Sequence, residues 1–294
     1  MDRADPTDSA DPATCCDRLV TPDGVTLHLR HWPTARPARG TVQLVHGLGE
    51  HIGRYEHVAA TLVGAGWHVV GHDHRGHGRS EGARGDVPRP LALLDDLALV
   101  LDRVRRPGPH LLLGHSLGGL VAARFAAEGL APAPAPFARE VDALVLSSPA
   151  LDAGMSALQT LMLAVLGPLA PHLRMGNGLD AAWICRDAAV VAAYRADPLV
   201  HDRITPMLAR FVVDAAARVR GLAPRWRVPT LLMWAGADRC VAPGGSAAFA
   251  AAAPPAALTA HEWPGLAHEI FNEPERADVL RMLVRWLDRD PAGA

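Results

Sequence analysis

The sequence predicts an α/β protein with a mostly parallel β-sheet covered by helices on both faces. Short runs that are apolar almost throughout alternate with segments of helical spacing along most of the 294 residues. Strands of this kind are typical of a parallel sheet buried between two layers of helices. The alternation is interrupted from about residue 150 to 206, where Gly and Pro break up the helical patches and no clear strand is found. This stretch is too long for a plain loop, which indicates an inserted cap.

The first part of the predicted core begins with a hairpin. In LVTPDGVTLHLRHW, residues 19–32, a Pro-Asp-Gly turn separates two strand-like runs. The helix expected at 90–106 has the clearest spacing, because its apolar side chains recur on one side. Those side chains are Leu91, Leu94, Leu97, Leu101 and Val104. The other strands expected in this part are 41–45, 67–73, 110–114 and 141–149, and the other helices are 54–66 and the run from 117.

The second part of the predicted core adds two strands and a final helix. The strands are 229–236 and 258–263, and the helix is 274–288. Pro274 is expected to open that helix, with Val279, Leu283, Trp286 and Leu287 on its inner face. The predicted division of the chain is therefore a disordered acidic leader at 1–16, a core formed by 17–149 and 207–294, and a helical cap at 150–206.

Composition and charge exclude several classes of function. The chain has 29 basic and 31 acidic residues, for a net charge of −2, so no strong field attracts nucleic acid. The 4 cysteines show neither CxxC pairs nor a close, even spacing, which indicates a reducing compartment without a disulfide framework. The leader is not a secretory or transit signal, and the longest apolar run, 157–170, is too short to span a bilayer. We expect a soluble, cytoplasmic protein.

The pentapeptide GHSLG, Gly114 to Gly118, lies where an apolar run gives way to a helical one. A strand–turn–helix elbow holds a nucleophilic serine at its apex, and the residues two before and two after it pack together, so both must be small. Ser116 and its two glycines meet that requirement. The alternative is a glycine-rich turn with an incidental serine.

A serine hydroxyl needs a base, and the base needs an orienting carboxylate. In this architecture they follow the serine in the order acid, then histidine. Asp238 directly follows the strand at 229–236, whereas its rivals Asp202 and Asp214 lie in the cap and in a helical run, where surface charges are expected. His268 lies between the last strand and the last helix, whereas His261 falls inside a strand.

The oxyanion of the intermediate needs two backbone N–H donors. One is expected on Leu117, directly after the nucleophile. The other is expected in the loop 46–49 after an early strand, on Leu48.

The segment GHDHRGHGRS admits a second interpretation. His72, Asp73, His74 and His77 have side chains that suit zinc or manganese. The competing interpretation is a structural turn in which Asp73 and Arg75 are hydrogen-bonded near the entrance of the site. We favour the turn and expect neither a metal nor another cofactor.

Several motifs resemble the monoacylglycerol lipase and lysophospholipase branch of the α/β-hydrolases. They are VHGLGEHIGRYEHVAATLVGAGWHVVGHDHRGHGRSEG, GHSLGGLVAARFA, SSPAL, YRADPLV, GADRCVAP and GLAHEIFNEPER, within residues 24–288. The resemblance implies an eight-stranded, mostly parallel sheet with a helical cap inserted after the sixth strand. It places the catalytic triad on Ser116, Asp238 and His268, the oxyanion donors on Leu48 and Leu117, and a polar-head pocket on Arg54, His115 and Tyr194.

The implied activity is hydrolysis of monoacylglycerol or lysophospholipid-type esters to fatty acid and alcohol through an acyl-enzyme. Two alternatives stay open: a carboxylesterase or thioesterase for other acyl esters, and a binding protein on the same scaffold. The cap segment SALQTLMLAVLGPLAPHL, residues 156–173, has apolar side chains at helical spacing. It either packs on the core or forms a lid that lines an acyl tunnel and touches membrane or micelle surfaces. The apolar side chains are Leu158, Leu161, Met162, Val165, Leu166 and Leu169.

Overall fold

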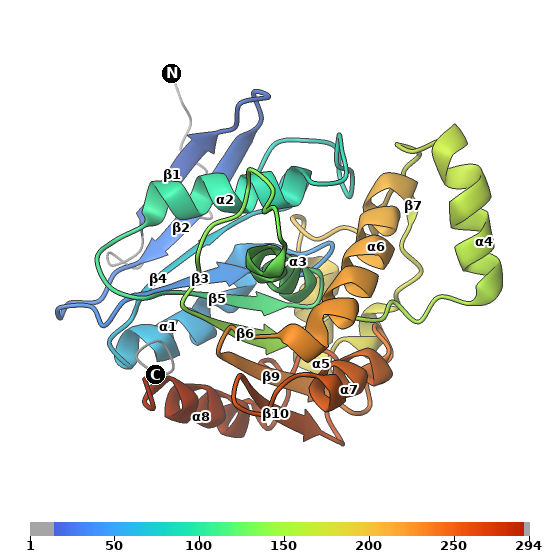
Figure 1. The fold of residues 1–294 in the computed structure, drawn as a ribbon. Helices are drawn as coiled ribbons and strands as arrows, with labels where there is room; N and C mark the ends of the chain where they lie inside the picture. The colour runs from blue at the N-terminus through green and yellow to red at the C-terminus, as the bar shows by residue number, and fades with distance from the viewer. Residues whose placement is uncertain (1–14, 291–294) are drawn as a thin grey trace.

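A twisted sheet of eight strands runs through the part of the chain that the computed structural model describes, residues 15–290 (Figure 1). The strand order is β1-β2-β4-β3-β5-β6-β9-β10. β2 pairs antiparallel with β1 and β4, and every other neighbouring pair is parallel, which confirms the predicted fold class. The bounds are β1 Cys15–Val20, β2 Thr26–Trp32, β3 Thr41–Val45, β4 His68–His72, β5 His110–His115, β6 Ala143–Ser147, β9 Thr230–Ala235 and β10 Leu258–Trp263.

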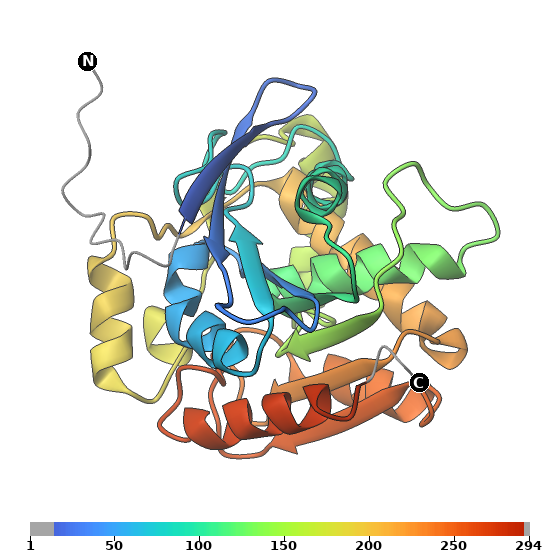
Figure 2. The same ribbon diagram turned by 90° about the vertical axis from the view of Figure 1, so that its left-hand side faces the viewer.

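Helices cover both faces of this sheet, as the apolar strands require (Figure 2). Along β5, Leu112 packs with the helices of one face, and Leu111 and Leu113 pack with those of the other. This alternation follows from the period of two in a strand. One face carries α2 Ala92–Val104, α3 Leu117–Ala127, α6 Pro206–Leu222 and α7 Pro243–Ala252, and the other carries α1 Glu56–Gly64 and α8 Arg276–Leu287. Short 3₁₀ helices are η1 Ile52–Tyr55, η2 Glu128–Leu130, η3 Gly167–Leu169, η4 Ala181–Trp183 and η5 Ala223–Arg225.

Three expectations about the elements need correction. Leu91 precedes α2 and is 38% exposed, whereas the other four apolar residues of the predicted stripe are buried. α8 begins at Arg276 and not at Pro274, although its predicted inner face is buried as expected. Cys15 and Cys16, which are predicted to lie in the disordered leader, belong to β1. Residues 1–14 lie outside the described part of the chain.

The segment between β6 and α6 contains α4 Ala157–Leu166 and α5 Ala188–Ala196. It also contains the two-residue strands β7 Met175–Gly176 and β8 Arg203–Ile204, which pair antiparallel. The expectation that this region holds no strand is therefore wrong, because pairs this short leave no alternation in the sequence. A capping box between Ser156 and Gln159 starts α4, which lies outside α6 as seen from the sheet (Figure 1).

The outer face of α4 is apolar and open to solvent. The side chains of five residues on α4 and the following turn are at least half exposed, so packing on the core is the wrong interpretation for them. They are Leu158, Leu161, Met162, Val165 and Leu169. The side chain of Leu166, the sixth residue of the predicted set, lies outside the described part of the structure. No helix within residues 15–290 combines the length and the apolar character needed to cross a bilayer.

Candidate active site

Ser116 occupies the sharp turn between β5 and α3. Its φ of 53° and ψ of −119° lie in a region that side chains rarely adopt, which is the strained geometry of a nucleophile elbow. A Cβ atom on Gly114 would meet the backbone of Gly118, and one on Gly118 would meet the carbonyl oxygen of Val45. Both glycines are therefore required by close packing, as the sequence predicts.

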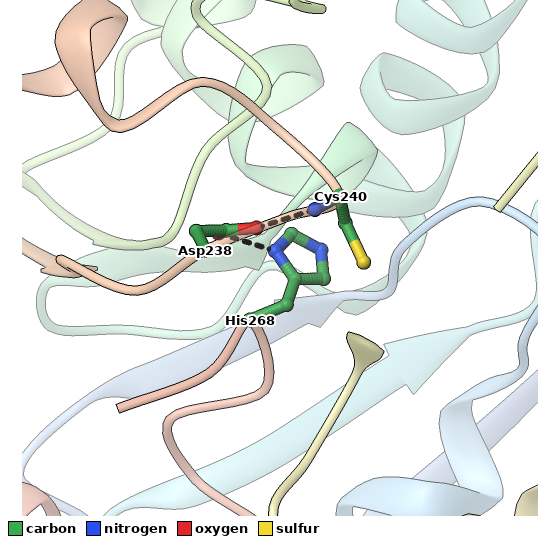
Figure 3. Close-up of side chains that lie close together, drawn as sticks. All are labelled: Asp238, Cys240 and His268. Atoms are coloured by element: carbon green, nitrogen blue, oxygen red, sulfur yellow. Dashed lines mark hydrogen bonds and ion pairs between the residues drawn. The ribbon is translucent and has the colours of Figure 1, made fainter. Parts of the chain in front are cut away.

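Asp238 and His268 meet at the carboxyl edge of the sheet, where they follow β9 and β10. Nδ1 of His268 lies 2.7 Å from Oδ2 of Asp238 (Figure 3), and because the carboxylate can only accept, Nδ1 donates. The other oxygen, Oδ1, accepts from the backbone N–H groups of Cys240 at 2.8 Å and Val241 at 3.0 Å. The carboxylate is thus fixed on both sides, and Nε2 of the imidazole is left to act as a base.

The environment of His268 favours its protonated form. Burial opposes the positive charge, but the Asp238 carboxylate more than offsets this, so the pKa of the imidazole is raised. A base of raised pKa accepts a proton more strongly, and the paired carboxylate stabilises the imidazolium that results.

Ser116 and His268 line one cavity of about 290 Å³. The wall also includes Leu48, Tyr194 and Cys240. Among the described residues, no hydrogen bond joins the Ser116 hydroxyl to His268. The structure therefore brings the predicted base and acid into contact and places the predicted nucleophile in the wall of the cavity that the base also lines.

Of the two leucines expected to supply oxyanion donors, Leu48 lines this cavity and Leu117 directly follows Ser116, which lines it. Leu48 follows β3 in the turn after His46 and lines the cavity. Leu117 is the first residue of α3, where backbone N–H groups have no acceptor within the helix. Such a pair of turns can present two N–H groups to one oxygen.

A buried ionic network that sequence reasoning missed holds the turn with Leu48. Oε1 of Glu50 accepts from the Gly47 backbone N–H at 2.6 Å and from the Tyr55 hydroxyl at 2.7 Å. Nη1 of Arg54 donates to Glu50 at 2.5 Å and to Glu269 at 2.6 Å. Burial disfavours the charged form of Glu50, but Arg54 more than offsets this and lowers the pKa of the carboxyl to about 2. The ionised Glu50 carboxylate therefore links the turn that contains Gly47 and Leu48 to Arg54.

The family resemblance assigns three residues to a polar-head pocket, and only two of them line the cavity. His115 and Tyr194 line the cavity. Arg54 lies against the Tyr194 ring, with its Cζ 4.7 Å from the ring centroid, and its guanidinium is bound by two carboxylates. The His115 ring centroid is 4.7 Å from that of His268, and burial lowers the pKa of His115 to about 4. A neutral His115 next to the base adds no competing positive charge.

None of the rival candidates pairs with another member of the predicted triad within the described residues, although Asp202 lines the same cavity as Ser116 and His268. Asp202 and Asp214 are exposed and pair with neighbouring arginines, and His261 stacks on Trp263 in β10. The carboxylate of Asp73 accepts from the backbone N–H groups of Ile52 at 2.7 Å and Arg79 at 2.8 Å. These hydrogen bonds support the interpretation of that segment as a structural turn.

Three side chains that line the cavity were not singled out from the sequence, namely Glu50, Glu269 and Cys240. Glu50 closes the HGLGE turn and Glu269 directly follows the predicted base, so adjacency was the available signal. Cys240 lies two residues after Asp238 and carries no motif of its own.

Comparisons with known proteins agree with this geometry. A family model described as serine aminopeptidase, S33 matches residues 36–275. The chain is 35% identical over 270 residues to a monoacylglycerol lipase of Mycolicibacterium smegmatis, covering 90% of this chain and 93% of that one. It is 33% identical over 273 residues to an uncharacterized abhydrolase domain-containing protein of Dictyostelium discoideum, of which it spans 28%.

A crystal structure of Paleococcus ferrophilus monoacylglycerol lipase superimposes with a TM-score of 0.79 at 36% identity. The match covers 89% of this chain and 98% of that one.

Proposed function

This chain belongs to the serine aminopeptidase, S33 family and is a serine hydrolase, and from that premise we propose that it cleaves monoacylglycerol or lysophospholipid-type esters to fatty acid and alcohol. The observation that carries the proposal is the Asp238–His268 hydrogen bond in the cavity that Ser116 also lines. The similarity to monoacylglycerol lipases supports the choice of substrate class.

The reaction has two halves. Nε2 of His268 takes the proton of the Ser116 hydroxyl as its oxygen attacks the acyl carbonyl. The N–H groups of Leu48 and Leu117 hold the oxyanion, and the protonated His268 then gives its proton to the leaving glycerol or glycerophospho oxygen. Water repeats these steps on the acyl-enzyme and releases fatty acid. Asp238 keeps the imidazole oriented and stabilises its cation.

The polar head of the substrate contacts His115 and Tyr194. Arg54 acts through Tyr194 and Glu50 and not by direct contact, because two carboxylates already occupy its guanidinium.

The experiment that tests this function is a substrate panel. Monoacylglycerols, lysophospholipids and p-nitrophenyl esters of increasing chain length are compared on the wild-type protein and on Ser116→Ala. We expect the lipid esters to be preferred and Ser116→Ala to lose at least about 10³-fold in rate. Activity confined to acetate esters would identify a short-chain carboxylesterase, and a wild-type rate for Ser116→Ala would remove Ser116 from the mechanism.

The exposed apolar face of α4 is the part of the proposed cap that contacts lipid. Five apolar side chains in that position would lose their contact with water at a membrane or micelle surface. We predict that Leu158→Ser combined with Leu161→Ser lowers binding to phosphatidylcholine vesicles in a sedimentation assay.

The matched control is Val20→Ser, which removes an equally exposed apolar side chain from β1. It should leave vesicle binding intact. Equal loss in both variants, or no loss in either, would show that α4 is not the contact surface.

A further inference from the structure

Cys240 places a sulfur atom against the base of the proposed triad. Figure 3 shows the sulfur on the side of the imidazole that faces away from Asp238. Sγ of Cys240, a ring nitrogen of His268 and a carboxylate oxygen of Asp238 all lie within 4.8 Å of one another. The Cys240 side chain takes no part in the hydrolytic steps derived above.

The Asp238–His268 pair already has the arrangement of a metal ligand and its support. A histidine that binds a metal through one nitrogen usually donates its other ring N–H to a carboxylate, which fixes the ring and strengthens the bond to the metal. His268 donates from Nδ1 to Asp238, so Nε2 is the free donor atom. Both oxygens of Asp238 are held by N–H groups, so Asp238 supports the site without binding the ion itself.

The second metal-ligating atom is the Cys240 sulfur. The combination of this sulfur with the His268 nitrogen determines which ions can bind. Imidazole nitrogen together with thiolate sulfur is a ligand set of Zn²⁺ and of other thiophilic divalent ions. The negative charges of Asp238 and Glu269 act on both donors and favour a cation between them. Water or the Ser116 hydroxyl, which lines the same cavity, can complete a tetrahedral set.

We propose that Cys240 Sγ and His268 Nε2 form an inhibitory binding site for Zn²⁺ or a similar thiophilic cation. When the ion binds, the thiol releases its proton to solvent and sulfur and nitrogen each donate an electron pair to the metal. The lone pair of Nε2 is then no longer available to Ser116, so an occupied site cannot hydrolyse esters. The inhibitory half of this proposal rests on the proposed function, whereas the binding half does not.

Metal binding is measured first, without reference to activity. The full-length protein is titrated with Co²⁺, which gives a near-ultraviolet charge-transfer band when a thiolate binds it, and Zn²⁺ binding is measured by equilibrium dialysis. We expect a saturable band and a single Zn²⁺ per chain in both the wild-type protein and Ser116→Ala. No thiolate band in either protein would overturn the site.

Substitutions then assign the donor. Cys240→Ser and, as a second replacement, Cys240→Ala should lose the band and raise the Zn²⁺ concentration for half-inhibition by at least about 10-fold. Cys185→Ser is the matched control, because Cys185 is also buried in the same apolar cluster and its sulfur contacts the Asn272 carbonyl oxygen. This control should keep both the band and the sensitivity to Zn²⁺.

Three results would contradict the proposal. Equal Zn²⁺ sensitivity in the Cys240 variants and the wild-type protein would remove Cys240 from the site. Transfer of the effect to Cys185→Ser would place the site elsewhere. Metal binding that leaves ester turnover unchanged in the wild-type protein would overturn the inhibitory role, and absence of turnover without metal would instead count against the proposed function.

Discussion

At the scale of single residues, two buried carboxylates have different tasks. Asp238 accepts from the imidazole of His268 and sets which nitrogen faces the substrate. Glu50 also lines the cavity, but its carboxylate accepts the Gly47 N–H and pairs with Arg54, so it fixes the turn that carries Leu48. Glu50 is therefore a positioning residue for the proposed oxyanion site.

Glu50→Gln tests that positioning. The amide keeps one acceptor oxygen but loses the charge that holds Arg54, so the turn is expected to shift. A small displacement of catalytic groups costs up to about 100-fold in rate, and we expect kcat to fall toward that value with a smaller change in KM. Glu140→Gln, an exposed carboxylate on a distant loop, is the control. An unchanged kcat for Glu50→Gln would show that the turn holds without the ionic tie.

The contact of Asp238 with His268, and the position of Ser116 in the same cavity wall as His268, could be predicted from the sequence because each residue follows a recognisable strand. Ser116, Asp238 and His268 lie at the ends of three apolar runs, and such ends meet at one edge of a parallel sheet. The pairing of Arg54 with Glu269 could not be predicted, because 215 residues separate the partners. Only the fold brings them together, and surface arginines and glutamates of the same types are common along the chain.

At the scale of elements, the turn between β5 and α3 is the most demanding part of the fold. Gly118 lies so close to β3 that any side chain would push against the Val45 and His46 carbonyl oxygens. Movement there also displaces the turn with Leu48, which follows His46. The turn with Ser116 and the turn with Leu48 are thus coupled through backbone contact.

We predict that Gly118→Ala lowers the free energy of unfolding by about 2 kcal/mol or more, since the added methyl group overpacks a buried contact with backbone. Urea denaturation measures this loss. Gly129→Ala is the control, because nothing lies within 4 Å of a Cβ at that exposed position. If the two variants unfold at the same urea concentration, the close approach at Gly118 is not a constraint.

The elements that the sequence predicted well are those with strong patterns. β3 at 41–45 comes from a mostly apolar run, and the buried face of α8 comes from a run with helical periodicity. The strands β7 and β8 have only two residues each, so their pairing depends on contacts between distant parts of the chain. One such contact is the hydrogen bond from the Asn177 backbone N–H to the Asp202 carbonyl oxygen at 2.7 Å. The start of α8 shifted because proline is accepted both in a first helical turn and in the turn before it.

At the scale of the whole molecule, a chain of buried histidines connects the sheet with the segment that follows α5. The rings follow one another in the order His72, His74, His46, His77 and the half-buried His201, with neighbouring ring centroids 4.4 to 5.4 Å apart. The backbone N–H of His201 also donates to the backbone carbonyl oxygen of Gly49 at 2.8 Å, next to Leu48. Burial lowers the pKa of His72 and His201 to about 4, so this chain stays neutral in the folded protein.

These histidines should make the protein sensitive to acid. The unfolded chain protonates an imidazole near pH 6.5, and folded His72 does so only near 4. Within that window the unfolded state binds more protons, so stability is full above it and falls as the pH falls. His72→Leu also removes two ring nitrogens that have no partner.

We predict that His72→Leu reduces the loss of unfolding free energy between about pH 7.5 and about pH 5 by roughly 2 kcal/mol. Urea denaturation at the two pH values measures it, with His261→Leu on the half-exposed edge strand β10 as the control. The same acid-induced loss in His72→Leu and the wild-type protein would show that His72 does not carry the effect.

Labelling with a fluorophosphonate followed by peptide mass mapping shows whether Ser116 is the activated nucleophile of the proposed mechanism. We predict a single adduct on Ser116, formed much more slowly in Asp238→Asn and at the wild-type rate in Asp214→Asn. An adduct on another residue, or an unlabelled protein that still hydrolyses esters, would contradict the account.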